Sequence, residues 1–390
     1  MLRPKTVLRV AVLVASGVGL MAVDAAAINI TIDYTYDASD FFGAGNPDGA
    51  AAGAEARAAV EAAAAFYSNL LDDSFAAIST PPVFDSDVFD GQVTWQSTWN
   101  FINPATGATV SIIDTEIAQD EYRVFAGARD LDGNTLGLGG FARGGGSSNP
   151  AGGFTQGEID EINQITADFF STLGTRGQTD GGFTAWGGTI AFDSSRDNWH
   201  YDHTSPPSSS EADFFSVVLH ELGHAVGLGT AEQWSDLLAN GLFTGAEAVG
   251  VFGSAPPADD DHWEQNVASL ILGTGITQET LMDPDIMLGD RKLVTALDAA
   301  ALLDIGWQAD LPASIAGDYD ADTRVTASDY SAWRDFVGPQ SLGPYSDWAE
   351  NFGAVSPAVA ATAIPEPTTL GLLATGLLAV ASRRGRSRPC

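Results

Sequence analysis

The chain has little cysteine and few basic residues, and each shortage excludes something. Its 390 residues include one cysteine, Cys390, so no disulfide can form within the chain, and a secreted fold must depend on its core and on metals. Lys5 and Lys292 are the only lysines, and the formal net charge is −34. A surface this acidic repels polyanions, so nucleic acid and anionic membranes are not expected as partners. The acidic surface is instead consistent with high solubility, with calcium binding or with a salty surrounding medium. The composition does not distinguish these three explanations.

The first 27 residues have the pattern of a secretory signal peptide. A basic start is followed by an apolar run, Val10 to Val23, and by the small residues Ala25 to Ala27, which suit cleavage. The alternative is a transmembrane anchor, but the apolar run is short for a span. We therefore predict secretion.

Hydrophobic periodicity predicts a domain in which strands and helices alternate. Expected strands are 28–34, 92–99, 109–113, 122–126 and 187–192, and expected helices are 54–71 and one opened by a Thr155–Glu158 capping box. The glycine-rich stretch 133–153 is expected to be a loop. Around its start Asp130, Asp132 and Asn134 alternate, as calcium ligands can, but a polar turn is the preferred interpretation. The pattern predicts an α+β fold with a mixed sheet.

A helix expected over 213–229 carries the chemistry. His220 and His224 lie four residues apart, so their imidazoles share one helical face and can converge on one ion. Glu221 points ~100° further round, beside such an ion, where a carboxylate can take a proton from water. Most other positions of this helix are apolar, so these polar groups need a partner. The HExxH spacing therefore predicts the active-site helix of a zinc peptidase.

A catalytic zinc site needs a third protein ligand. In the metzincin clan of zinc peptidases the motif continues to HExxHxxGxxH. Here Gly227 is present, but Thr230 occupies the last histidine position, so either the site is inactive or the third ligand lies elsewhere. His200 and His203 precede the helix and are interpreted as loop histidines, with a second metal site or a substrate contact as the alternative. The remaining histidine is His262.

His262 and Trp263 resemble the His-Trp pair from which leishmanolysin-like metzincins take their third ligand, well downstream of the helix. Leu281 to Pro284 resembles the Met-turn of the clan, and Gly187 to Phe192 resembles a matrixin strand. The resemblance covers residues 187–307 well and residues 28–186 weakly. A last helix, which Thr295-Ala-Leu-Asp298 can cap and which ends in Ile305-Gly306-Trp307, is similar to the helix that closes such domains.

The resemblance implies definite roles. His220, His224 and His262 would hold one zinc ion, Glu221 would be the general base and then the acid, and Met282 would support the site without ligating. The strand 189–192 could pair with an extended peptide substrate.

After Trp307 the composition changes. The spacing of a calcium-binding loop is present here. The side-chain ligands would be Asp318, Asp320, Asp322 and Asp329, and Arg324 would supply a backbone carbonyl. Thr323 stands where the loop usually has glycine. Two following segments, starting at Tyr330 and Tyr345, repeat Tyr-Ser-x-Trp, so the region resembles a degenerate dockerin pair with one calcium site. The alternative is an acidic linker with two short helices.

The chain closes with Pro365-Glu366-Pro367, an apolar run and a basic tail. This resembles a PEP-CTERM sorting signal, which implies export followed by processing at the cell surface. A C-terminal membrane anchor is the alternative.

Together these features divide the chain into a signal peptide (1–27), a metallopeptidase domain (28–310), a calcium module (311–356), a linker (357–364) and a sorting signal (365–390). The expected function is a secreted or surface-associated zinc endopeptidase acting on proteins or peptides, with sorting machinery as a partner. A matrix or cell-surface partner could bind the C-terminal module. The alternative is an inactive calcium-binding surface protein on the same scaffold, and a structural zinc site without catalysis is a third interpretation.

Overall fold

A computed structural model describes residues 28–178, 182–309, 311–312, 315–319, 324–335 and 345–355. The expected signal peptide and sorting signal lie outside these residues. The helices are α1 Ala50–Leu70, α2 Gln156–Thr175, α3 Phe214–Ala225, α4 Glu232–Asp236, α5 Ala246–Phe252, α6 Ala296–Asp304, α7 Ala327–Asp335 and α8 Tyr345–Asn351. No helix of this described part is long and apolar enough to cross a membrane.

The strands form two larger sheets and three short pairs. The central sheet contains β1 Asn29–Asp33, β5 Glu121–Arg129, β8 Gly187–Asp193 and β6 Gly137–Ala142, in that order. The second sheet contains β2 Phe84–Asp85, β3 Gln92–Ile102, β4 Thr109–Ile113 and β7 Gly144–Ala151. The short pairs are β9 Trp199–His200 with β10 Ala212–Asp213, β11 Leu238–Ala239 with β12 Leu242–Phe243, and β13 Ala268–Leu270 with β14 Thr277–Glu279.

The central sheet is mixed. β1, β5 and β8 run parallel, and β6 pairs antiparallel with β8 as the last strand in the order. β5 and β8 are buried along nearly their whole length, as strands covered on both faces are. The predicted α+β class with a mixed sheet is confirmed.

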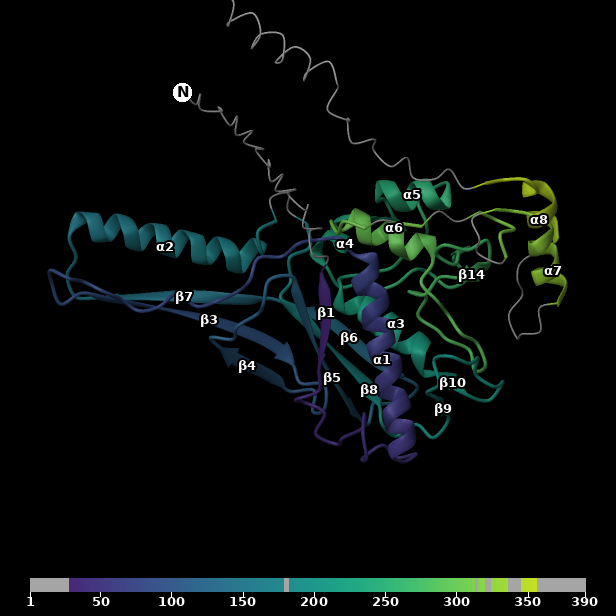
Figure 1. The fold of residues 1–390 in the computed structure, drawn as a ribbon, viewed down its shortest axis with the longest axis horizontal. Helices are drawn as coiled ribbons and strands as arrows, with labels where there is room; N and C mark the ends of the chain where they lie inside the picture. The colour runs from purple at the N-terminus through teal and green to yellow at the C-terminus, as the bar shows by residue number, and fades with distance from the viewer. Residues whose placement is uncertain are drawn as a thin grey trace, which may run out of the picture.

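Helices α1 and α3 pack against each other and against the central sheet (Figure 1). The Tyr67 hydroxyl of α1 donates to the Leu219 carbonyl of α3 at 3.0 Å, and the Tyr122 hydroxyl of β5 donates to the Ala225 carbonyl at the end of α3. Residues 29–70 are thus built into the core that holds α3.

The second sheet extends away from this core and carries α2 on one face (Figure 1). The capping box predicted at the start of α2 is confirmed, because the Thr155 hydroxyl accepts from the Glu158 amide and the Glu158 carboxylate accepts from the Thr155 amide. The stacked rings of Phe101 and Phe125, 4.4 Å apart, join this sheet to the central one.

Two sequence-based expectations are wrong here. The stretch 133–153 is not a loop, because it forms β6 and β7. Glycine weakens an isolated strand, but β6 gains a continuous register with β8. The strand 189–192 cannot add a substrate strand either, because it belongs to β8, which β5 and β6 flank on both sides.

Candidate metal centre

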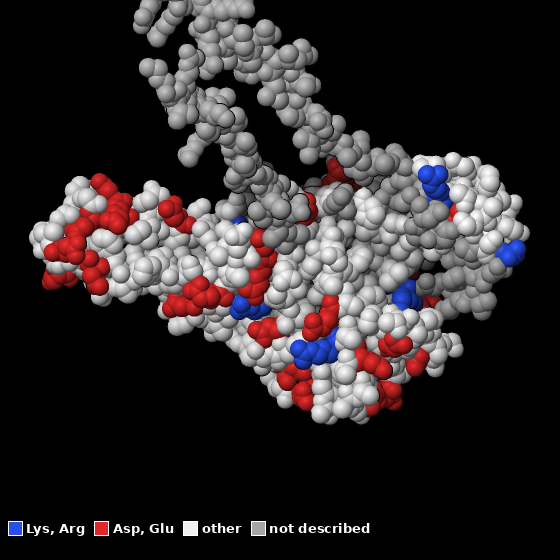
Figure 2. Space-filling view, viewed as in Figure 1, with Lys and Arg blue, Asp and Glu red and all other residues white. Residues whose placement is uncertain are grey.

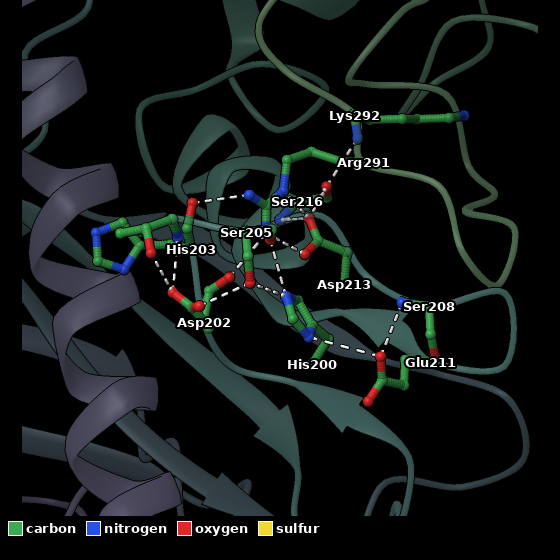
Figure 3. A network of polar contacts seen from close by, with 11 residues as sticks. His200, Asp202, His203, Ser205, Ser208, Glu211, Asp213, Ser216, Arg291 and Lys292 are labelled. Atoms are coloured by element: carbon green, nitrogen blue, oxygen red, sulfur yellow. Dashed lines mark hydrogen bonds and ion pairs between the residues drawn. The ribbon is translucent and has the colours of Figure 1, made fainter. Parts of the chain in front are cut away.

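Helix α3 begins at Phe214, and Asp213 caps its first turn. Asp213 is fully buried, and its carboxylate accepts from the Ser216 amide at 3.1 Å. Arg291 holds the same carboxylate with two hydrogen bonds, at 2.6 and 2.9 Å, and also donates to the His203 carbonyl at 2.7 Å (Figure 3). The start of the helix is therefore fixed to the segments that flank it in space.

Beyond α3 the chain turns sharply through Gly227 and Gly229. At Gly229 φ is +68°, and a Cβ there would lie 1.7 Å from the Asp261 carbonyl oxygen. Only glycine fits this approach. The turn thereby brings the segment that carries His262 next to the end of the helix.

The structure brings His220, His224 and His262 together. The Nε2 atom of His262 lies 3.2 Å from Nε2 of His220 and 3.2 Å from Nε2 of His224. The outward-facing Nδ1 atoms of His220 and His224 lie 2.9 Å from the carbonyl oxygens of Leu281 and Leu228, respectively. These carbonyls can only accept, so Nδ1 carries the hydrogen and the two Nε2 lone pairs point inward.

This donor set fits a zinc ion. Four-coordinate zinc with nitrogen ligands at 2.0–2.1 Å requires neighbouring nitrogens about 3.3 Å apart, close to the separations here. Burial lowers the pKa of all three imidazoles, to about 4 for His224, and the mutual proximity of His220 and His224 lowers the pKa of His220 further. The imidazoles are therefore neutral at neutral pH, as metal ligands must be. Within the described residues they form the one group of three side chains spaced to hold a metal.

Glu221 is buried beside this group, with 6% of its surface exposed. Desolvation raises its pKa to about 8. A divalent cation held by the histidines would favour the carboxylate and oppose this rise. Strand β6 covers Glu221 from one side, because a Cβ at Gly137 would lie 2.6 Å from its Oε1 atom.

Thr230 does not take part in the histidine cluster. Its hydroxyl donates to the His224 carbonyl at 2.7 Å, so it satisfies the end of the helix. The third imidazole near those of His220 and His224 is that of His262, at 3.2 Å from each Nε2 atom.

Asp298 holds the two segments that complete the site. This buried carboxylate accepts from the Trp263 indole at 2.9 Å and from the amides of Leu281 and Met282 at 3.0 and 3.3 Å. It also closes the predicted capping box of α6 with Thr295. Burial raises the pKa of Asp298, and these hydrogen bonds oppose the rise. Sequence inspection identified Asp298 only as a helix cap, because its contacts with Trp263 and the Met-turn span distant segments.

Met282 is fully buried, and its carbonyl accepts from the Trp263 amide at 3.0 Å. The predicted Met-turn therefore lies directly against the His262 segment.

A cleft of about 890 Å³ runs past the three histidines and Glu221. β6 and the segment before it, 134–139, line one side. The chain after Met282, including Ile286 and Leu288, lines the other side together with Lys292. An extended chain can therefore reach the histidine cluster.

His200 and His203 lie outside both the cleft and the metal cluster. The His200 ring lies between the Ser205 carbonyl, 2.8 Å from Nε2, and the Glu211 carboxylate, 3.6 Å from Nδ1 (Figure 3). The His203 ring packs 5.7 Å from the Phe215 ring. His200 thus belongs to β9 rather than to a loop, and His203 lies in the turn that follows, as the preferred interpretation had it.

The calcium ligands expected from the sequence are described only in part. Asp318 and Asp329 are buried, and the Tyr319 amide donates to Asp329 Oδ1 at 2.8 Å. Asp320 and Asp322 lie outside the described residues. The calcium site and the dockerin likeness therefore stay predictions.

Comparison with known proteins identifies two segments of the chain. Residues 163–248 match the family model of Matrixin, and residues 363–386 match the PEP-CTERM protein-sorting motif. No curated protein and no solved structure matches the chain. The Matrixin segment contains His220, Glu221 and His224 and ends before His262. One segment of the chain is thus similar to the Matrixin family of metallopeptidases, and the C-terminal motif indicates export to the cell surface or beyond.

Proposed function

We propose that the protein is a zinc-dependent endopeptidase of the cell surface or extracellular space. The observation that carries the proposal is the convergence of three Nε2 atoms at the floor of an open cleft, with Glu221 beside them. His220, His224 and His262 would hold the ion. When bound, zinc would lower the pKa of water from 15.7 towards ~7 and polarise the scissile carbonyl.

Glu221 performs the proton transfers. As a carboxylate it takes a proton from the attacking water, and as the acid it returns a proton to the leaving amine. Burial raises the pKa of Glu221 above that of an exposed glutamate, and a bound ion would oppose this rise.

Strand β6 is the element that would orient the substrate. It ends the order of the central sheet, and its residues 137–139 line the cleft next to Glu221. An extended peptide can pair with its outer edge, so that main-chain hydrogen bonds align the scissile bond. This assigns to β6 the role that the sequence suggested for β8.

The domain limits belong to the same proposal. Residues 28–310 form the peptidase domain, since β1 and α1 contribute to the core that holds α3. Residues 311–356 form the C-terminal module, in which the Tyr330 and Trp348 rings of α7 and α8 pack 5.2 Å apart. Calcium would bind at residues 318–329, where Asp318 and Asp329 are buried and the Tyr319 amide donates to Asp329. A matrix or surface partner of this module is part of the proposal.

The alternative of an inactive binding scaffold was favoured by Thr230. That support is weakened because Thr230 caps α3 and His262 lies 3.2 Å from the other two imidazoles.

The test compares wild-type protein with Glu221→Ala, His262→Ala and His203→Ala, the last as a histidine outside the cluster. We expect wild type and His203→Ala to bind one zinc and to hydrolyse casein or quenched peptides. Glu221→Ala should keep zinc and lose ~10²–10⁴-fold in kcat. His262→Ala should lose zinc as measured by elemental analysis.

Absence of hydrolysis by zinc-loaded wild type would refute the peptidase proposal. Undiminished zinc in His262→Ala would refute the assignment of the third ligand. A calorimetric titration with calcium, in which Asp318→Ala and Asp329→Ala abolish the binding heat, tests the C-terminal site separately.

A further inference from the structure

Two basic side chains line the cleft, and they differ in how their donors are used. The Lys292 ammonium is buried and lies 2.9 Å from Glu279 Oε2, 3.1 Å from Asp283 Oδ1 and 2.6 Å from the Asp285 carbonyl. Its three donors are matched by three acceptors. Lys292 therefore fixes the wall of the cleft and has no donor left for a substrate.

Arg196, unlike Lys292, has donors without acceptors among the described residues. Its Nη1 atom donates to Asn198 Oδ1 at 3.0 Å, which is its one hydrogen bond within the described part of the chain, and its Cζ atom lies 5.7 Å from the centre of the Trp199 ring. Its Nε atom is buried and has no hydrogen-bond partner there. No carboxylate among the described residues forms an ion pair with Arg196. Among the described residues the Nη2 atom likewise has no acceptor, and unlike Nε it is not buried.

The position of Arg196 along the cleft follows from the backbone. The Ala212 amide donates to the Asn198 carbonyl at 2.9 Å, and β9 pairs with β10, so this segment lies at the start of α3. Ser216 and Val217, which line the same cleft, precede His220 by about one helical turn, or ~6 Å. Arg196 therefore lines the cleft on the side towards the start of α3.

A carboxylate can accept a charge-assisted hydrogen bond from the Nη2 atom, for which the described residues supply no acceptor. We propose that Arg196 is a specificity residue that binds a carboxylate of the peptide substrate. This inference rests on the peptidase function proposed above. The carboxylate can come from an aspartate or glutamate side chain or from the C-terminus of a short peptide.

The charge of the whole protein opposes this selectivity. The formal net charge is −34, and Figure 2 shows acidic side chains spread over the face drawn, most densely on the extension that carries α2. Long-range repulsion of acidic peptides is screened beyond ~8 Å at physiological salt. The preference for a carboxylate must therefore come from a local contact. As salt screens the long-range repulsion, the rate of hydrolysis of acidic peptides should rise.

The experiment uses the full chain loaded with zinc and four quenched peptides that differ only in Glu or Gln after the scissile bond and in a C-terminal acid or amide. The variants are Arg196→Gln and Arg196→Lys, with Arg57→Gln as a control, since Arg57 is exposed and pairs with Glu61 on α1. Hydrolysis is measured as kcat/KM. Binding of the same peptides to Glu221→Ala, alone and combined with Arg196→Gln, is measured by fluorescence anisotropy.

We expect wild type and Arg57→Gln to prefer one carboxylate source by roughly 10- to 100-fold, the range of a hydrogen bond between charged groups. Arg196→Gln should lose that preference, Arg196→Lys should keep part of it, and Arg57→Gln should match wild type on all four peptides. Whether the preference follows Glu or the C-terminal acid identifies the source.

Equal rates and equal affinities for all four peptides would overturn the role of Arg196 while leaving the peptidase intact. If no peptide is hydrolysed, the peptidase proposal fails. The anisotropy difference between acidic and neutral peptides then still decides for or against the Arg196 site.

Discussion

Strand β6 approaches α3 so closely that one position in it should not tolerate a methyl group. A Cβ at Gly139 would lie 2.2 Å from the Glu221 carbonyl oxygen and 2.9 Å from its Cα atom. These atoms belong to the backbone of a buried helix, so no rotation of a side chain can relieve the contact. At Gly140, the next residue, a Cβ would meet nothing within 4 Å. The pair Gly139→Ala and Gly140→Ala thus adds the same group on two sides of one strand.

The expected effects differ in size and in kind. Overpacking of a buried contact costs about 1–3 kcal/mol, which we expect for Gly139→Ala, whereas Gly140→Ala should stay within about 0.5 kcal/mol of wild type. To make room, β6 must move away from α3 by more than a few tenths of an ångström. Since β6 lines the cleft beside Glu221, such a shift should lower kcat/KM by ~10²-fold.

Urea denaturation followed by circular dichroism gives the free energies of unfolding, and hydrolysis of a quenched peptide gives the rates. Zinc content, measured on the same samples, should be unchanged in both variants, because neither glycine lies beside an Nε2 atom. If Gly139→Ala and Gly140→Ala have equal stability and equal activity, the strand does not pack on the α3 backbone and the role of β6 in substrate binding fails.

Three further predictions concern the metal and the buried acids. Thr230→Ala should retain zinc and lose about 1 kcal/mol of stability, because its hydroxyl only caps the His224 carbonyl at 2.7 Å; zinc loss measured by elemental analysis would contradict this. Asp298→Ala should cost about 3–5 kcal/mol in urea denaturation, because it leaves the Trp263 indole and two Met-turn amides without their acceptor. In zinc-free protein the raised pKa of Glu221, from 4.5 to about 8, contributes stability that is complete below pH ~4.5 and is lost as the pH rises through ~8. Glu221→Gln should therefore gain on wild type by about 3–5 kcal/mol across that interval, and parallel pH profiles of the two proteins would refute the buried environment assigned to the acid.

Features encoded over short distances were predictable from the sequence. The spacing of His220 and His224 placed both imidazoles on one face, and the Thr155 and Thr295 caps fixed where α2 and α6 begin. These signals lie within one turn of helix, so local stereochemistry determines them. The alternating and buried apolar runs likewise located β3 and β8.

The errors arose where tertiary contact overrides local preference. Glycine disfavours a strand, and the sequence from Gly137 to Ala142 therefore suggested a loop. In the fold, glycine is required there because the strand passes against the backbone of α3. Because β6 was expected to be a loop, β8 was taken for the edge strand, whereas β6 lies at that edge. Sequence periodicity carries no information about such an approach between distant segments.

The position of His262 makes the metal site depend on two separate segments of the chain. In a motif confined to one helix and the turn after it, all ligands are positioned by local structure. Here two ligands come from α3, while the third depends on the packing of Trp263 and Met282 around Asp298. Zinc affinity is then linked to the stability of that packing, because the ion binds only the folded arrangement of all three histidines. A change at Asp298, which touches none of the three imidazoles, should therefore weaken zinc binding through His262 while α3 stays folded.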